Sequence, residues 1–140
     1  MNYRINKVFS SNEKKLITFV TGGDPDLETS KKIINTIAKS GADIVEIGIP
    51  FSDPMADGPT IQLSSKRAIE QGINLDHIFS ICQNFRITNN DIPLILMGYY
   101  NVIFHYGIQK FVNACEKNGV DGLIVVDLQP EEDPELLDEI

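Results

Sequence analysis

The sequence has little that points to metal, redox or histidine chemistry. Its 140 residues include only two cysteines and two histidines. Cys82 and Cys115 are far apart and fit neither the spacing of a metal site nor that of a redox motif, which predicts a reducing, cytoplasmic setting. His77 and His105 are isolated, so the sequence predicts neither a metal centre nor a histidine-based catalytic triad.

Basic residues and long apolar runs are also scarce. Twelve lysines and arginines stand against twenty acids, which gives a net charge of −8. A nucleic-acid site needs clustered bases to neutralise phosphates, and an anionic membrane surface repels an acidic protein, so neither partner is predicted. No apolar run approaches the length that spans a bilayer, and the first residues lack the apolar core of a signal peptide. The composition is typical of a soluble globular protein.

What the sequence does contain is an alternation of short apolar runs with segments of helical period. Strands are predicted at 16–21, 43–49, 92–97 and 122–126, and helices at 30–39, 61–71, 75–82 and 108–118, with another helix beginning near 134. Apolar strands that alternate with helices indicate an α/β fold with a parallel sheet. Spacing alone leaves open whether the sheet is doubly wound or part of a (β/α)8 barrel. The first strand is not followed by Gly-x-Gly-x-x-Gly, which disfavours a dinucleotide site.

An acid inside an apolar strand is the most informative feature of the chain. Glu46 shares one face of its strand with Ile44 and Gly48, because successive side chains of a strand alternate between faces. Desolvation among aliphatic neighbours disfavours the charged form of a carboxyl group, which suits a residue that gives and takes a proton near neutral pH. A structural glutamate held by a base or by backbone donors fits the position equally well.

The loop that leaves this strand holds two further acids, and parallel α/β folds assemble their sites at that end of the strands. Asp57 is placed to stabilise positive charge on a substrate nitrogen, but an aspartate before Gly-Pro is also a good N-cap, and spacing slightly favours the cap. Asp53, before Pro54, is typical of a turn. Tyr99 and Tyr100 follow the third strand and suit either stacking on an aromatic ligand or an ordinary wall. No segment makes a good phosphate cradle.

Four segments together resemble the tryptophan synthase alpha subunit family. They are FVTGGDP at 19–25, EIGIPFSDPMADGPTIQ at 46–62, LMGYYN at 96–101 and the pair at 126–127, and the second is highly specific. The resemblance implies that residues 1–140 are the N-terminal half of a single (β/α)8 TIM-barrel domain, with about the first four β/α units present and strands five to eight absent. It also implies a lyase of tryptophan biosynthesis. Such a lyase cleaves indole-3-glycerol phosphate to indole and glyceraldehyde 3-phosphate by a retro-aldol step, without metal or organic cofactor.

The same resemblance implies roles for single residues. Glu46 corresponds to the general acid/base that protonates the indole ring carbon and helps to deprotonate the glycerol hydroxyl. Asp57 corresponds to the carboxylate that pairs with the indole N–H, which outweighs the N-cap interpretation, and Phe19 and Tyr99 to residues that line the indole pocket. A beta subunit, which joins the full-length family in an alpha2beta2 heterotetramer, is expected to contact Pro50, Asp53, Pro54, Asn101 and Phe104.

The sequence departs from the family pattern in two loops and in length. Val102 stands where proline is common, and Gln129 stands in a segment that usually reads Asp-Leu-Pro-Pro. A (β/α)8 barrel takes about 250 residues, and four strands alone leave two open edges and a bare apolar face. We therefore expect the 140 residues alone to be unstable, self-associating or completed by a partner. The alternative to a lyase is a catalytically incompetent half-barrel that binds a beta subunit or self-associates.

Overall fold

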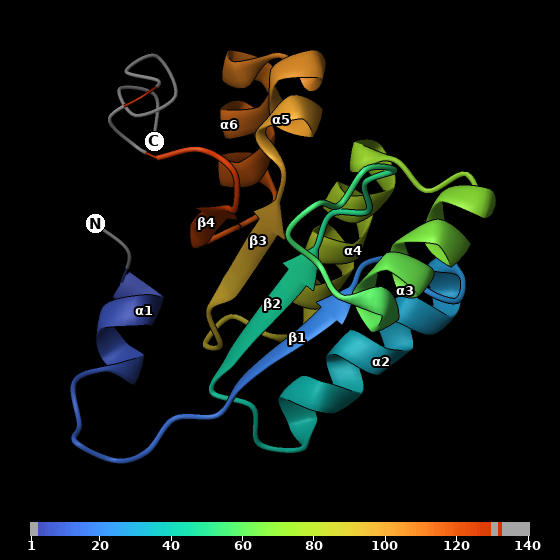
Figure 1. Ribbon diagram of the computed structural model, residues 1–140. Coiled ribbons are helices and arrows are strands. Elements are labelled where there is room, and N and C mark those ends of the chain that lie inside the picture. The colour runs from blue at the N-terminus through green and yellow to red at the C-terminus, as the bar shows by residue number, and fades with distance from the viewer. Residues whose placement is uncertain (1–2, 130–131, 133–140) are drawn as a thin grey trace.

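Four parallel strands in sequential order form the centre of the structure, a computed structural model that describes residues 3–129 and 132 (Figure 1). The strands are β1 (Ile17–Thr21), β2 (Ile44–Gly48), β3 (Leu94–Gly98) and β4 (Gly122–Val125). Hydrogen bonds join them in the order β1-β2-β3-β4, and every pair is parallel. A doubly wound sheet reverses its strand order at a switch point, whereas this sheet adds each strand to the same edge. The predicted class, the first four β/α units of a TIM barrel, is confirmed.

Helices connect the strands and precede the first of them. In the described part of the chain they are α1 (Tyr3–Val8), α2 (Leu27–Lys39), α3 (Pro59–Glu70), α4 (Leu75–Thr88), α5 (Tyr100–Tyr106) and α6 (Ile108–Lys117). The four predicted helices correspond to α2, α3, α4 and α6, and α2 begins earlier than predicted because Asp26 caps it, accepting a hydrogen bond from the Thr29 N–H at 2.9 Å. The helix predicted near 134 lies outside the described residues. Among residues 3–129 and 132, no helix combines the length and apolarity needed to cross a membrane.

One face of the sheet packs against the helices and forms the core. Val45 and Ile47 of β2 are fully buried there, and Leu94 of β3 joins them. Their partners in the helices are chiefly Ile34 and Ala38 of α2, Ile78, Cys82 and Phe85 of α4, and Phe111 of α6. The alternation along β2 therefore turns Ile44, Glu46 and Gly48 to the other face, the one that lines the interior of a barrel.

That interior face is partly covered by α1, which lies across the sheet from α2 and α4 (Figure 1). Ile5 of α1 comes within 3.5 Å of where a Cβ atom would stand on Gly122. Ile44 and Ile95, near the amino ends of their strands, are only 4% and 8% exposed. The bare apolar face that four strands were expected to leave is thus reduced. Its most exposed apolar side chains are Ile17 and Ile124, on the two edge strands.

A buried carboxylate fastens α1 to the sheet and to α4. The Asp121 side chain, 3% exposed, accepts hydrogen bonds from Arg4 Nη1 at 2.8 Å, from the Leu94 N–H at 2.8 Å and from Arg86 Nη2. Burial lowers the pKa of Arg86, and the Asp121 carboxylate opposes that shift. Nε and Nη1 of Arg86 donate to three backbone carbonyls, those of Gly119, Asn89 and Ile92. This end of the sheet is therefore closed by a polar cluster in which no buried side-chain atom lacks a hydrogen-bond partner among the described residues.

Asp121→Asn is expected to lower the free energy of unfolding by about 3 kcal/mol or more, because it leaves a buried guanidinium without its carboxylate. Urea unfolding followed by circular dichroism measures the loss. The exposed pair between Lys7 Nζ and Asp91 Oδ1, at 2.9 Å, supplies a matched control. Asp91→Asn should barely move the unfolding midpoint, since exposed ion pairs contribute little. Equal losses in the two variants would show that burial of Asp121 is unimportant.

Candidate active site

The parallel register brings the carboxyl ends of the strands to one edge of the sheet. Thr21 of β1 pairs with Gly48 of β2, and Gly48 pairs with Met97 of β3. A small cavity of about 20 Å³ opens at this edge. Its lining includes Phe19, Asp57 and Tyr99. The structure therefore brings together three of the residues that the resemblance linked to one substrate, although they come from β1, from the loop after β2 and from the end of β3.

Glu46 lies in the middle of β2 beside that cavity, on the barrel-interior face. Its Cα atom is paired with that of Phe19 on one side and with that of Ile95 on the other. Glu46 is half-buried, whereas the other four residues of the strand are buried. No hydrogen bond or ion pair links its carboxyl group to any residue within 3–129 or to 132. A structural glutamate held by a base or by backbone donors thus finds no such partner in the part of the chain that the structure describes.

Asp57 is linked to the end of β3 by a hydrogen bond with Tyr99. The Tyr99 hydroxyl donates to Asp57 Oδ2 at 3.0 Å, and the hydroxyl oxygen of Tyr99 accepts a hydrogen bond from the Ala56 N–H at 2.9 Å. The ring of Phe51, at the start of the same loop, packs against Tyr99 with centroids 5.1 Å apart. Burial raises the pKa of the Tyr99 hydroxyl, and the nearby Asp57 carboxylate adds to that rise while the Ala56 N–H opposes it.

Asp57 is not the N-cap of α3. Gly58 occupies the N-cap position, makes no side-chain capping hydrogen bond, and is followed by Pro59 in the first turn. A capping aspartate directs an oxygen to the first amides of its helix, whereas the Asp57 carboxylate turns to Tyr99. The N-cap interpretation, which spacing alone slightly favours, is wrong.

Phe19 occupies space that a glycine leaves open. A Cβ atom on Gly48 would stand 2.6 Å from Phe19 Cζ, far inside van der Waals contact. Gly48 follows Glu46 on the same face of β2, so the Phe19 ring leans over β2 from the neighbouring strand, on the carboxyl-end side of the acid. The pairing of a small residue with a large one thus places an aromatic surface next to Glu46.

The sequence analysis missed two serines behind this cavity, Ser64 and Ser65. Thr21 Oγ1 and Ser64 Oγ lie 2.6 Å apart and join the end of β1 to α3. Ser65, only 4% exposed, lines the cavity, and its hydroxyl has no hydrogen-bond partner among the described residues. Short hydroxyl side chains are ordinary on the solvent face of a helix, so no signal in the sequence distinguishes these serines from surface residues.

The residues expected to face a partner lie on the surface but not in one groove. Asp53, Asn101 and Phe104 are exposed, and Pro50 and Pro54 are half-buried. Asn101 and Phe104 belong to α5, a helix that the sequence analysis did not predict, and Phe104 is 64% exposed. Pro50 and Asn101 line one groove of about 380 Å³.

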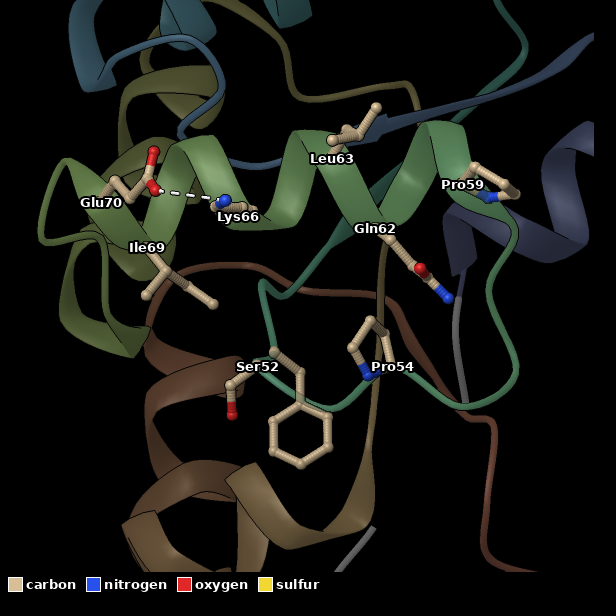
Figure 2. A pocket seen from close by; sticks show the side chains of 9 residues that line it. Ser52, Pro54, Pro59, Gln62, Leu63, Lys66, Ile69 and Glu70 are labelled. Carbon is tan, nitrogen blue, oxygen red and sulfur yellow. Dashed lines mark ion pairs between the residues drawn. The ribbon is translucent and has the colours of Figure 1, made fainter.

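Pro54 lines a different groove, of about 500 Å³, between the loop after β2 and α3 (Figure 2). In Figure 2, Gln62 and Ile69 project from α3 toward the loop, and Lys66 pairs with Glu70 at 3.8 Å. This groove shares no lining residue with the cavity at Asp57. Helix α3 thus presents Ile61 and Ser65 to the cavity and a separate face to the groove.

A sequential parallel sheet, with helices between its strands, defines the class, that of the barrel proteins built from β/α units. A family model described as the tryptophan synthase alpha chain matches residues 5–140. The chain belongs to that family, as the sequence motifs predicted.

Individual relatives agree. The chain is 59% identical over 121 residues to the tryptophan synthase alpha chain of Geotalea uraniireducens (strain Rf4), a match that covers 86% of this chain and 45% of the relative. Tryptophan synthase subunit alpha from Legionella pneumophila str. Paris superposes with a TM-score of 0.93 at 42% identity, over 99% of this chain and 54% of that one. A chain of the tryptophan synthase a2b2 complex from Pyrococcus furiosus gives 0.83 at 38% identity, over 89% and 50%. The chain spans about half the length of the relatives it matches.

Gly48→Ala is expected to displace the Phe19 ring and to lower the free energy of unfolding by about 1–3 kcal/mol, as overpacking does. Gly58→Ala is the control for the added methyl group, because nothing lies within 4 Å of its Cβ position, and any small loss there comes from alanine being a poorer N-cap than glycine. Urea unfolding compares the two variants, and Phe19→Leu in the Gly48→Ala background should recover part of the loss. An unchanged midpoint in Gly48→Ala would mean that the ring is not held against β2.

Proposed function

We propose that this chain carries the proton-transfer groups of a tryptophan synthase alpha-type lyase, which cleaves indole-3-glycerol phosphate to indole and glyceraldehyde 3-phosphate in tryptophan biosynthesis. One observation carries the proposal: the Asp57 carboxylate lines a cavity together with Phe19 and Tyr99, and a second acid, Glu46, is paired in the sheet with that same Phe19. Membership of the family supports it.

Cleavage of the carbon–carbon bond beside an indole ring requires somewhere for the bonding electrons to go. In the proposed reaction the Glu46 carboxyl group protonates the ring carbon that bears the glycerol chain. The ring then carries positive charge at its nitrogen and can accept the electron pair. The Asp57 carboxylate accepts the hydrogen bond of the ring N–H and stabilises that charge.

The second half of the reaction returns the proton. The Glu46 carboxylate takes the proton of the hydroxyl on the adjacent side-chain carbon, and the C–O bond becomes the carbonyl of glyceraldehyde 3-phosphate. The electrons of the broken carbon–carbon bond restore the aromatic ring of indole. Glu46 ends protonated, as it began, so each step moves only a proton or an electron pair and the proposal calls for no cofactor.

The aromatic side chains define the ring site. Phe19 leans over Gly48 and Tyr99 stands across the cavity, so an indole ring between them would place its N–H toward Asp57. The matched relatives are about twice as long as this chain. We propose that a second half of the barrel supplies the phosphate-binding loops and a mobile lid.

We also propose that a beta subunit docks over the loop after β2 and over Asn101 and Phe104 of α5. The Pyrococcus furiosus relative is described in an a2b2 complex, and Phe104 presents an exposed ring on α5. The proposed compartment is the cytoplasm, since both cysteines are free and the chain belongs to a family of biosynthetic enzymes. The alternative function, that of a catalytically incompetent half-barrel that binds a beta subunit or self-associates, would use this same surface. Measuring turnover distinguishes the lyase from this binding function.

Glu46→Gln is expected to reduce indole release about 100- to 10,000-fold, the usual contribution of a general acid–base group. The assay uses this chain joined to the second half of a related alpha chain, with indole-3-glycerol phosphate as substrate. Glu70→Gln is the control, because Glu70 lies on α3 and pairs only with Lys66 among the described residues.

Circular dichroism should be the same in both variants. Substantial turnover in Glu46→Gln would remove Glu46 from its role. A joined chain that binds a beta subunit but releases no indole, with or without Glu46, would favour the binding function instead.

A further inference from the structure

We propose that Tyr99 is a positioning residue whose hydroxyl fixes the Asp57 carboxylate and holds the loop that carries it. This role is separate from that of its ring as a wall of the pocket. It deepens the proposed function, since it rests on the assignment of Asp57 to the ring N–H.

The loop after β2 is attached to Tyr99 at both of its ends. Phe51 packs on the Tyr99 ring where the loop begins, and Ala56 and Asp57 hydrogen-bond to the Tyr99 hydroxyl where it ends. The loop between is exposed, with Met55 80% accessible. The other hydrogen bonds of residues 51–58, within the part of the chain that the structure describes, run inside the loop or to α3. Tyr99 is thus the hydrogen-bond link from these residues to a neighbouring strand end.

The direction of the two hydrogen bonds follows from the donor count. A tyrosine hydroxyl has one proton and can also accept. Because the Ala56 N–H has no option but to donate, the oxygen of Tyr99 accepts there and its proton goes to Asp57 Oδ2. The N–H polarises the hydroxyl and makes it a stronger donor to the carboxylate.

This arrangement divides the work of the two carboxylate oxygens. Oδ2 of Asp57 is held by Tyr99, whereas Oδ1 accepts no hydrogen bond from a described residue. The Asp57 backbone carbonyl is held separately, by Gln62 Nε2 at 2.9 Å. One oxygen is therefore anchored and the other is left to receive a ligand N–H in a fixed direction, which is what pre-organised charge stabilisation requires.

Tyr99→Phe separates the hydroxyl from the ring, because it removes one oxygen atom and keeps the packing against Phe51. The chain offers a matched control in Tyr106, whose hydroxyl donates to Asp76 Oδ1 at 2.7 Å outside the site. Tyr106→Phe therefore also deletes a tyrosine–aspartate hydrogen bond, but one that has no contact with Asp57.

In the joined chain described above, Tyr99→Phe is expected to lower kcat roughly 10- to 100-fold, the effect of losing one hydrogen bond to a charged group, with little change in KM. The decisive readout is a double-mutant cycle. In an Asp57→Asn background, Tyr99→Phe should cost almost nothing further, because it acts through Asp57. Tyr106→Phe should leave kcat unchanged in either background.

The positioning role would be overturned if Tyr99→Phe lowered kcat by the same factor with and without the Asp57 carboxylate. The proposed function would still stand in that case, provided that the joined chain without substitutions releases indole. A second measurement does not depend on activity or on the folding of Tyr99→Phe. In the joined chain, NMR of tyrosines labelled at Cζ follows each hydroxyl titration separately, and these 140 residues contribute four tyrosines. Asp57→Asn should lower the pKa of Tyr99, since the carboxylate raises it. An unchanged titration would equally overturn the proposal.

Discussion

Each strand of the sheet is hydrogen-bonded in parallel to the next, and that pairing forces all four carboxyl ends to one edge. The loops that leave these ends therefore lie next to one another. Asp57, after β2, and Tyr99, after β3, meet there although they are 42 positions apart in the sequence. The same pairing sets the alternation that turns Glu46 away from the helices. The candidate site is therefore a consequence of strand order and register. A change that breaks the strand pairing would separate the site residues even if each of those side chains were kept.

The two ends of the sheet use polar groups in opposite ways. At the amino end, Asp121 is buried and accepts from Arg4, from Arg86 and from a backbone amide, so its charge is compensated. At the carboxyl edge, Glu46 and the Ser65 hydroxyl have no partner among the described residues. No buried side-chain polar atom of the described residues lacks a hydrogen-bond partner, so these two groups remain accessible to water or to a ligand. The contrast separates the end whose polar groups are paired within the protein from the end whose polar groups are open to an outside partner.

The sequence predicted the elements whose pattern is long enough to be read. All four strands and α2, α3, α4 and α6 show clear periodicity, whereas α1 and α5 have 6 and 7 residues, too few turns for an amphipathic repeat. Alternation predicted that Glu46 shares a face with Ile44 and Gly48, but the packing of the helices against Val45 and Ile47 decides that this face is the interior one. The orientation of Asp57 could not be predicted, because the local rule pointed to a helix cap and the competing partner, Tyr99, comes from another strand end. The burial of Ser65 could not be predicted either, because burial of a helix face depends on which loop packs against it.

The cavity beside Asp57 is far smaller than the several hundred Å³ typical of ligand pockets. In the proposed reaction it would hold only the N–H edge of the ring, and the rest of the indole would lie across the sheet face toward Glu46. The groups proposed to move protons and stabilise charge lie within these 140 residues, whereas the phosphate site is proposed to lie in a second half of the barrel. In such an arrangement, groups of this half act mainly on the transition state and groups of the other half mainly on substrate binding. Substitutions of Glu46 and Asp57 should therefore change kcat more than KM, because the proposed phosphate site, which would contribute most to substrate binding, belongs to the other half of the barrel.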